Sequence, residues 1–250
     1  LVGSEMCIRD RNIGLSHARG KWIIFADADD FFTADCFTIL NEYMDSPHKV
    51  IYFNVRFVMS DDPSQESRRG TYYTNFFNDV NPENKLRYQS QVPWGKMIRR
   101  SFLSTFHIQF DETRIANDVY FSCLVGIYAP KVTTDRRIIY YCTESGQSLA
   151  MSKQDRESLI IRFNASMKCN RLLRQEKIHY YLSPLPWCIP SAKTKEWLPA
   201  KYFFEYLFFF RLQAFKELYY AFSAILSHMN EPATKETDNQ CNKKTTNLKE

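Results

Sequence analysis

The apolar positions of the chain fall into continuous runs and into runs with helical spacing. Residues 22–26 are a continuous apolar run, which is typical of a strand buried on both faces of a mostly parallel sheet. Residues 50–59 are a second strand candidate, and residues 132–142 contain a third. Helical spacing over residues 118–128 predicts an amphipathic helix. Strands and helices in this order indicate an open α/β sheet.

Two helices are predicted near the start of the chain. The first covers residues 12–20 and ends at Gly20. The second follows Thr33 or Asp35, either of which can cap it, and ends before Pro47. The apolar positions of this second helix recur at helical spacing and are expected to face the core; they are Phe37, Leu40 and Met44.

The later part of the chain has weaker patterns before it becomes strongly helical. Residues 60–92 are polar and aromatic with little periodicity, which predicts an irregular loop or short edge elements. Residues 101–104 are predicted to be helical and residues 108–110 extended. A long helix is predicted over residues 154–178, and a second, aromatic helix over residues 201–228.

These patterns divide the chain into four parts. Residues 1–11 resemble the translated sequencing-adapter string that contaminates some assembled reads, so residues 1–10 are left out of the fold argument; the alternative is a genuine N-terminal helix. Residues 12–152 form the α/β domain and residues 153–229 a helical extension. Residues 230–250 are polar, and we expect them to be disordered.

Composition limits the class of protein. Of the 250 residues, 44% are hydrophobic and 24% charged, which is ordinary for a soluble globular protein. The net charge of +5 comes from scattered basic residues, which favours a solvated surface over a nucleic-acid site, although a mildly basic face also suits phosphate-bearing donors or an anionic membrane. The seven cysteines lack C-x-x-C spacing, so we expect buried free thiols in a reducing cytosol. No apolar run reaches the roughly 18 residues of a spanning helix, and no secretion signal is recognisable.

Three carboxylates follow the apolar run of residues 22–26, namely Asp27, Asp29 and Asp30. In open α/β sheets ligands bind outside the carboxyl ends of the strands, so these side chains are placed for function. Closely spaced carboxylates repel one another unless a cation or hydrogen-bond donors intervene, and a divalent ion shared with substrate phosphates is the usual solution. The pair Asp27 and Asp29 therefore predicts a Mg²⁺ or Mn²⁺ site. The alternative is an acidic turn that caps the next helix.

The run R-N-I-G-L-S-H-A-R-G-K-W-I-I-F-A-D-A-D-D-F, residues 11–31, resembles the core segment of the family 2 glycosyltransferases. In that family a helix carrying R-N-x-G leads into a strand that ends in a metal-binding D-x-D. Residues 93–103, P-W-G-K-M-I-R-R-S-F-L, resemble the family's W-x-K-(L/M)-(Y/I)-R-R segment. Residues 108–121 are similar to the stretch that leads into an acidic pair, and residues 139–149 to the strand and turn that follow.

The resemblance implies an α/β fold of the GT-A type, a Rossmann-like mixed sheet with flanking helices, here incomplete and followed by a C-terminal helical extension. It also implies roles for the matched residues at the strand end. Asp29 would be the principal metal ligand, with Asp27 contacting the donor ribose or sharing the metal and Asp30 holding the loop. Arg11 and Asn12 of the R-N-x-G helix would lie on the donor side.

On the acceptor side the resemblance makes Asp118 the catalytic base, which takes the proton from the acceptor hydroxyl as that oxygen attacks the anomeric carbon. The sequence departs from the family at Asn117, where an acidic residue is usual. Asp118 has an alternative role as the N-cap of the following helix. Trp94 is a candidate for stacking on an acceptor sugar and Lys96 for meeting phosphate; a packed Trp and a surface Lys are the alternatives.

The implied function is inverting transfer of a sugar from a nucleotide-diphosphate donor to a hydroxyl of a saccharide or lipid-linked saccharide, in cell-surface polysaccharide or lipopolysaccharide synthesis. A bacterial protein in the cytoplasm or on the inner membrane face is expected. Residues 201–228, aromatic with Arg211 and Lys216, would either pack on the domain or lie at the membrane surface. In the family a strand and a phosphate-proximal loop precede R-N-x-G; nothing here corresponds to them, so we expect weak donor binding and an open sheet edge.

Two other functions remain open from the sequence. Hydrolases of the haloacid dehalogenase-like class also place D-x-D at a strand end, with the first Asp as the nucleophile. In that class a Thr or Val usually follows the pair by two positions, whereas here Asp30 and Phe31 follow it. No later acidic Mg²⁺ motif is recognisable. A catalytically inactive fragment or a membrane-surface binding module, with a purely structural acidic turn, is the alternative outside enzymology.

Overall fold

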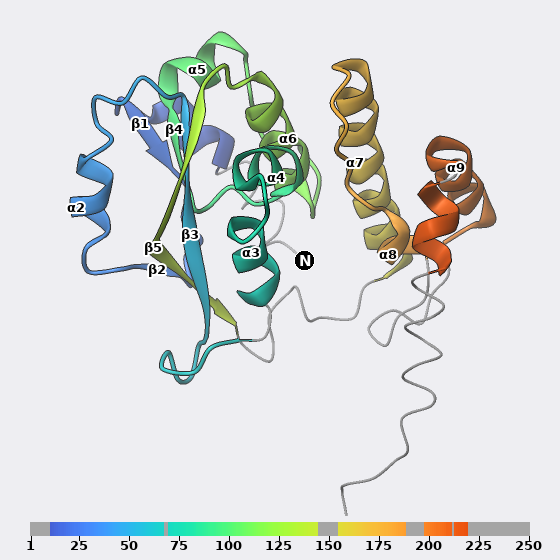
Figure 1. The fold of residues 1–250 in the computed structure, drawn as a ribbon, viewed down its shortest axis with the longest axis horizontal. Coiled ribbons are helices and arrows are strands. Elements are labelled where there is room, and N and C mark those ends of the chain that lie inside the picture. Colours follow the sequence, from blue (N-terminus) through green and yellow to red (C-terminus); the bar gives the residue numbers. More distant parts are fainter. Residues whose placement is uncertain (1–10, 68–69, 145–154, 189–197, 212, 220–250) are drawn as a thin grey trace, which may run out of the picture. The chain divides into compact units, whose positions relative to one another are not determined.

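The structure, a computed structural model, describes the chain in five ranges: residues 11–67, 70–144, 155–188, 198–211 and 213–219 (Figure 1). The adapter-like residues 1–10 and the tail of residues 230–250 lie outside them. The chain divides into two units, residues 1–202 and residues 203–250, and each is considered by itself.

Unit 1 is built on a five-stranded sheet with the strand order β1-β4-β3-β5-β2. The strands are β1 (Trp22–Ile24), β2 (Phe31–Phe32), β3 (Val50–Met59), β4 (Lys96–Arg99) and β5 (Val132–Glu144). The β3–β5 pair is parallel, and the other three pairs are antiparallel. A mixed sheet with flanking helices is what the sequence predicts, and the α/β class is confirmed.

The prediction that residues 22–26 form a strand buried on both faces of a mostly parallel sheet is wrong. β1 is an edge strand of the described sheet, it runs antiparallel to β4, and of its three residues only Ile23 is buried. The buried strand is β3, whose first four residues are completely inaccessible to solvent. β3 and β5 pair in parallel along the whole of β3, and this pair forms the centre of the sheet. Both strands are much longer than β1, which has three residues.

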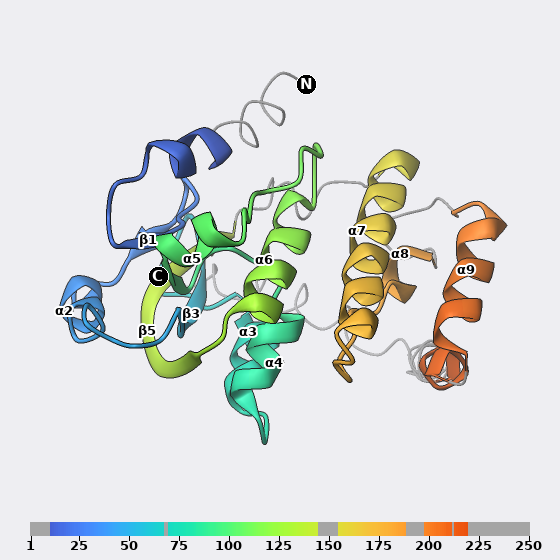
Figure 2. The same ribbon diagram turned by 90° about the horizontal axis from the view of Figure 1, so that it is seen from above.

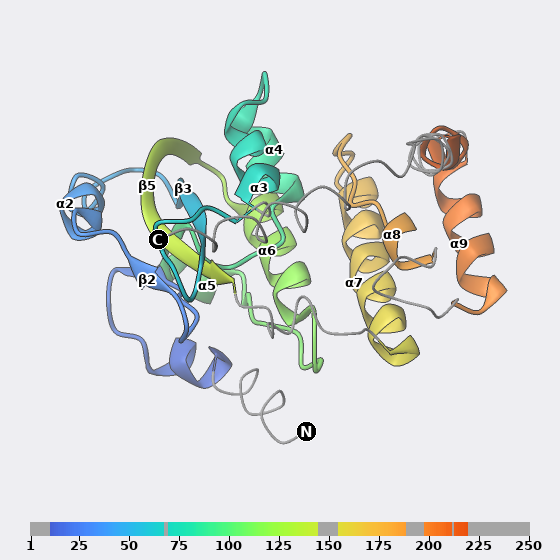
Figure 3. The ribbon, with the colours of Figure 1, turned by 90° about the horizontal axis from the view of Figure 1, so that it is seen from below.

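Helices cover both faces of this sheet. Residues 11–17 are helical, and the named helices are α2 (Cys36–Asn41), α3 (Gly70–Phe77), α4 (Pro82–Gln89), α5 (Arg100–Thr105), α6 (Asn117–Tyr128), α7 (Arg156–Gln175), α8 (Leu185–Cys188) and α9 (Ala200–Phe210). Figures 2 and 3 show α3, α4 and α6 on one side of β3 and β5, with α2 on the other. α7 packs against α6 through a smaller apolar cluster that includes Val119, Cys123, Cys169 and Leu173.

Several predicted elements are confirmed. β3 has the predicted bounds, and α5, α6 and α7 lie where helices are expected. The five cysteines in the described residues are free and buried, as predicted. Among the helices of the described residues, none has the length and apolar character needed to cross a membrane.

Other predictions are wrong for identifiable reasons. The stretch over residues 60–92 contains α3 and α4 rather than an irregular loop or short edge elements, and Asn81 caps α4 by accepting a hydrogen bond from the Asn84 N–H at 3.1 Å. In α2 the core-facing residues are Cys36, Ile39 and Leu40, so the prediction for Leu40 is confirmed. The predictions for Phe37 and Met44 are wrong, because these side chains are 72% and 39% exposed.

Candidate functional site

The loop that follows β1 is fixed by the neighbouring strand β5. The Asp30 carboxylate accepts hydrogen bonds from the Tyr140 hydroxyl and from the Thr143 backbone N–H, both at 2.7 Å. The Asp27 backbone N–H donates to the same Tyr140 hydroxyl at 2.8 Å, and the Thr143 hydroxyl donates to the Asp29 carbonyl at 2.9 Å. Asp30 therefore holds the loop by its side chain, which leaves the Asp27 and Asp29 carboxylates for other partners.

The three carboxylates affect one another electrostatically. Burial raises the pKa of Asp30 above its ordinary value, the hydrogen bonds from Thr143 and Tyr140 oppose this, and the charges of Asp29 and Asp27 raise it further. The loop thus carries concentrated negative charge that its own hydrogen bonds only partly offset. A cation bound beside Asp29 and Asp27 would relieve that repulsion.

Arg11 connects the loop after β1 to the start of α6. One guanidinium N–H forms an ion pair with the Asp27 carboxylate at 2.5 Å, and the other donates to the Asn117 side-chain oxygen at 2.9 Å. Asn12, the next residue, holds the Phe110 backbone from both sides, accepting from its N–H at 2.9 Å and donating to its carbonyl at 3.1 Å. Arg11 and Asn12 therefore use their side chains to hold neighbouring segments of the site together.

Asp118 lies in the first turn of α6, close to the groups that Arg11 joins. The N-cap position is occupied by Ala116, in a left-handed conformation with φ of 53°, so the N-cap alternative for Asp118 is wrong. Burial raises the pKa of Asp118, with nearby Asp27 adding to the rise, while Arg11 and Lys96 lower it. Asp118 and the D-x-D loop thus share one electrostatic environment.

Lys96 is completely buried beneath this site, at 0% exposure, so the surface-lysine alternative is wrong. Its ammonium group donates hydrogen bonds to the carbonyls of Ser90, at 3.3 Å, and Val92. It lies 5.6 Å from the centre of the Tyr52 ring. Burial lowers the pKa of Lys96 to about 7, and the negative charge of Asp118 opposes that shift.

Trp94 is 9% exposed and packs inside the core, as the packed-tryptophan alternative describes. Its ring lies 5.3 Å from Tyr73, 5.6 Å from Phe57 and 6.2 Å from Tyr140, which it stacks against. Trp94 thus supports the residue that fixes the loop after β1. Its part in acceptor binding stays a prediction.

Three residues of the site were not identified from the sequence. Tyr140 and Thr143 belong to a strand that the apolar pattern predicts, but the pattern says nothing of where a hydroxyl or an N–H points. Arg162 of α7 is the third: burial lowers its pKa, and the charge of Asp118 opposes the shift. The available signal was an arginine within the long helix predicted over residues 154–178.

The comparisons with known proteins agree with this geometry. The model of glycosyl transferase family 2 matches residues 5–106, so this segment is similar to that family. The matched segment contains the R-N pair, the three carboxylates of the loop, Trp94 and Lys96. Asp118 lies beyond the matched residues. No curated protein sequence matches the chain.

Solved structures with a related fold are similar to the chain at low sequence identity. TarS 1–349 from S. aureus in complex with UDP-GlcNAc has a TM-score of 0.49 at 17% identity, and the match covers 70% of this chain and 48% of that one. The mannosyltransferase PcManGT from Pyrobaculum calidifontis, in complex with GDP-Man and Mn²⁺, has a TM-score of 0.43 at 14% identity, over 91% of this chain and 55% of that one. The chain thus spans about half the length of these proteins.

The matched segment offers a divalent cation a limited set of ligands. The Asp29 carboxylate is exposed and makes no hydrogen bond or ion pair with the described residues, and the second oxygen of Asp27 is likewise without a partner there. Within the described ranges no group of three or more His, Cys, Asp or Glu side chains could hold a metal. Two carboxylates suit Mg²⁺ or Mn²⁺ that is shared with substrate phosphates, since such ions commonly take only one or two protein carboxylates.

Proposed function

We propose that the chain is the carboxylate-bearing part of an inverting, metal-dependent glycosyltransferase of the GT-A type. It would move a sugar from a nucleoside-diphosphate donor to a hydroxyl of a saccharide or lipid-linked saccharide, in the synthesis of a cell-surface polysaccharide or lipopolysaccharide. The main support for the proposal is a pair of hydrogen bonds from Arg11. One goes to Asp27 of the D-x-D loop and the other to Asn117, the neighbour of Asp118.

On the donor side, Asp29 would hold Mg²⁺ or Mn²⁺ with Asp27 as a second ligand or a contact of the ribose. The bound ion would supply Lewis-acid stabilisation of the diphosphate, whose negative charge grows as the sugar leaves. Asp30 contributes indirectly, because its bonds to Tyr140 and Thr143 fix the loop from which the other two carboxylates project. The ion pair of Arg11 with Asp27 offsets part of the negative charge that the loop presents to an anionic donor.

On the acceptor side, Asp118 would accept the proton of the attacking hydroxyl. A positioned general base contributes about 10² to 10⁴ in rate and works best when its pKa approaches the working pH. Burial raises the pKa of Asp118, which moves it in that direction, and Arg11 and Lys96 restrain the rise. Direct attack at the anomeric carbon, through an oxocarbenium-like transition state, inverts the configuration without a covalent intermediate.

The haloacid dehalogenase-like alternative is not supported. The residues that follow the pair, Asp30 and Phe31, depart from the pattern of that class, and Asp27 is ion-paired with Arg11 through one of its oxygens. The family match, which covers the whole D-x-D loop, also favours sugar transfer. The inactive-fragment alternative is an outcome of the experiment below.

The test is a panel of nucleotide sugars incubated with the chain and Mn²⁺, with release of nucleoside diphosphate as the readout. We expect turnover of at least one donor, a loss of about 10²-fold or more in Asp118→Asn, and loss of the Mn²⁺ response in Asp29→Asn. Asp61→Asn is the matched control, because Asp61 is exposed and lies in the turn after β3. Wild-type turnover in Asp118→Asn would exclude Asp118 as the base, and no turnover of any donor would favour the inactive fragment.

We also propose that the aromatic C-terminal helix contacts the inner membrane surface, where a lipid-linked acceptor would be found. Phe204 and Phe208 of α9 are four residues apart and strongly exposed, and Phe215 in the next helical stretch is exposed as well. Residues 220–228 of the predicted helix lie outside the described residues. Co-sedimentation of the chain with anionic vesicles, lost in the Phe204→Ser, Phe208→Ser double variant, would support the contact. Equal co-sedimentation of both would contradict it.

A further inference from the structure

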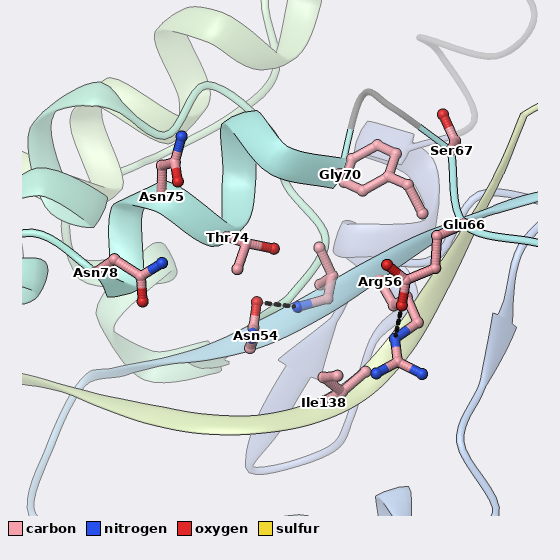
Figure 4. Close-up of a pocket in the computed structure, with 11 residues that line it drawn as sticks. Asn54, Arg56, Glu66, Ser67, Gly70, Thr74, Asn75, Asn78 and Ile138 are labelled. Carbon is pink, nitrogen blue, oxygen red and sulfur yellow. Dashed lines mark hydrogen bonds and ion pairs between the residues drawn. The ribbon is translucent and has the colours of Figure 1, made fainter.

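A polar recess lies between α3 and the central strands, and none of Asp27, Asp29 and Asp30 lines it. Its volume is about 460 Å³, within the range of small-molecule sites. Its lining comes from β3, β5, α3 and the segments on either side of α3; the side chains used below are Asn54, Arg56, Phe57, Glu66, Thr74, Asn78 and Ile138. Figure 4 shows Thr74 on α3, and Asn78 just after its end, opposite Asn54 on β3.

An irregularity in the sheet shapes the recess. The register of β3 against β5 shifts on both sides of Asn54, which is the mark of a bulge, and bulges commonly re-aim side chains beside functional sites. The Asn54 side-chain oxygen accepts a hydrogen bond from the Val55 N–H at 2.9 Å. This bond fixes the amide and leaves its NH₂ group as a donor at the recess.

The helical wall of the recess carries polar groups without protein partners. Thr74 lies on α3, and Asn78 lies in the turn directly after Phe77, the last residue of that helix; both line the recess. Their side chains make no hydrogen bond with the rest of the described chain. Together with Asn54 they offer a neutral set of donors and acceptors, which is the set that matches the hydroxyls of a sugar.

The charges at the recess cancel. Arg56 and Glu66 form an ion pair at 3.1 Å and the other lining residues are uncharged, so the lining carries no net charge. Phe57 and Ile138 add an apolar surface that suits the C–H face of a sugar ring. The lining thus favours a neutral polyhydroxylated ligand over a nucleotide.

We infer that the recess between α3 and β3 is a binding subsite for a neutral saccharide. The ligand would be a unit of the acceptor, an assignment that rests on the proposed function, because the donor's diphosphate finds no uncompensated positive charge here. The recess is connected to the loop after β1 by ring contacts: Phe57 packs on Trp94 at 5.6 Å, and Trp94 stacks on Tyr140 at 6.2 Å. Tyr140 in turn holds Asp30.

The inference is tested by saturation-transfer NMR on the full chain, without nucleotide or metal. The probes are the methyl glycosides of glucose, galactose, mannose and N-acetylglucosamine at millimolar concentration. We expect at least one of them to bind, and the double variant Thr74→Val, Asn78→Leu to weaken that binding about tenfold, because two hydrogen-bonding groups are removed. Asn41→Leu is the matched control, since Asn41 is an exposed amide on α2, outside the recess.

A second measurement does not depend on variants. In the wild-type chain, the amide resonances that shift on adding the glycoside should belong to α3 and β3. Binding that is unchanged in the double variant, shifts that map elsewhere, or no binding by any of the four glycosides would overturn the inference. Displacement of the glycoside from these resonances by UDP would also overturn it, because the recess would then be a nucleotide site.

The two proposals fail in different ways. Asp118→Asn should bind the glycoside like the wild type, because Asp118 does not line the recess. Glycoside binding in a chain that turns over no nucleotide sugar would leave the subsite standing and remove the transferase. If the chain turned over a nucleotide sugar, bound no glycoside and kept its turnover in the double variant, the transferase would stand and the subsite would be removed.

Discussion

Arg11 and Asp27 form an ion pair at 2.5 Å, and the same guanidinium reaches Asn117 at 2.9 Å. One side chain thereby joins the loop after β1 to the first turn of α6. Arg11 therefore joins the segments that carry the proposed metal ligand, Asp29, and the proposed general base, Asp118. The relative position of these segments therefore depends on Arg11.

This link predicts the effect of changing Asn117. Asn117→Asp keeps an acceptor oxygen for Arg11 and restores the acidic residue usual in the family, so activity should stay within about threefold of the wild type. Asn117→Leu removes the acceptor and leaves a guanidinium N–H without a partner, so kcat should fall at least about tenfold. Steady-state kinetics with the donor found in the panel makes the comparison. Equal activity of the two variants would show that Arg11 does not position α6.

Tyr140 predicts a second effect, on metal binding. Its hydroxyl donates to Asp30 and accepts from the Asp27 N–H, and its side chain is buried. Tyr140→Phe should cost about 1–3 kcal/mol of unfolding free energy and weaken Mn²⁺ binding about tenfold or more, since residues that orient metal ligands have effects of that size. Electron paramagnetic resonance of free Mn²⁺, with UDP present, measures the affinity.

Tyr141→Phe is the control for that measurement. Tyr141 is the next residue of β5; its ring stacks on Phe31 at 4.9 Å, and its hydroxyl makes no hydrogen bond with the described residues. We expect this variant to bind Mn²⁺ like the wild type. A loss as large as that of Tyr140→Phe would mean that the hydroxyl bridge is not what fixes the loop.

The pKa of Asp118 predicts the pH dependence of turnover. A base acts in its deprotonated form, so activity should fall as pH drops through the pKa of Asp118, and burial raises that pKa above the ordinary aspartate value. The acid limb of the kcat profile should accordingly lie above the pH expected for an exposed aspartate. Lys96 lowers this pKa, so Lys96→Met should move the limb to higher pH. An acid limb that stays in place would show that Lys96 does not act on the base.

The sequence predicts β3, α6 and α7 well because each is long and has a clear apolar pattern. It also places the carboxylates at a strand end, because an apolar run that stops at three acidic residues has few other interpretations. The role of Asp118 came from the family resemblance, since its electrostatic interaction with Arg11 and Asp27 joins residues far apart in the chain. No local pattern contains that information.

The missed elements are short or depend on partners elsewhere. β2 has two residues and β4 has four, and both exist because β5, β3 and β1 pair with them. The start of α4 was recognisable from Asn81 and Pro82, a cap followed by a proline in the first turn. The burial of Lys96 was not, because its ammonium is satisfied by the carbonyls of Ser90 and Val92, whose positions only the fold determines.

Lys96 also predicts how stability changes with pH. In the unfolded chain its ammonium keeps the proton up to about pH 10.4, whereas in the folded protein its pKa is lowered to about 7. Between these values the folded state binds fewer protons, so raising the pH favours folding, by at most about 1.4 kcal/mol per pH unit. Urea unfolding between about pH 7 and 9 should show wild-type stability rising relative to Lys96→Met. A constant difference would mean that Lys96 stays charged in the fold.

Gly126 of α6 predicts the largest loss of stability. A Cβ atom there would lie 1.8 Å from the backbone oxygen of Arg87 in α4, and Arg87 donates hydrogen bonds to the carbonyls of Gly126, at 2.9 Å, and Ala129, at 2.8 Å. Gly126→Ala must separate the two helices. The gain in helix propensity, about 1 kcal/mol, is smaller than the overpacking cost, so we expect a net loss of at least about 2 kcal/mol.

Gly14→Ala is the matched control, because Gly14 is also helical and its added Cβ would meet no atom within 4 Å. This variant should be stabilised by up to about 1 kcal/mol, through helix propensity alone. Urea unfolding of both variants gives the comparison. If Gly126→Ala were as stable as Gly14→Ala, α4 and α6 could not be in backbone contact, and the helix that carries Asp118 would not be held against α4 as the structure has it.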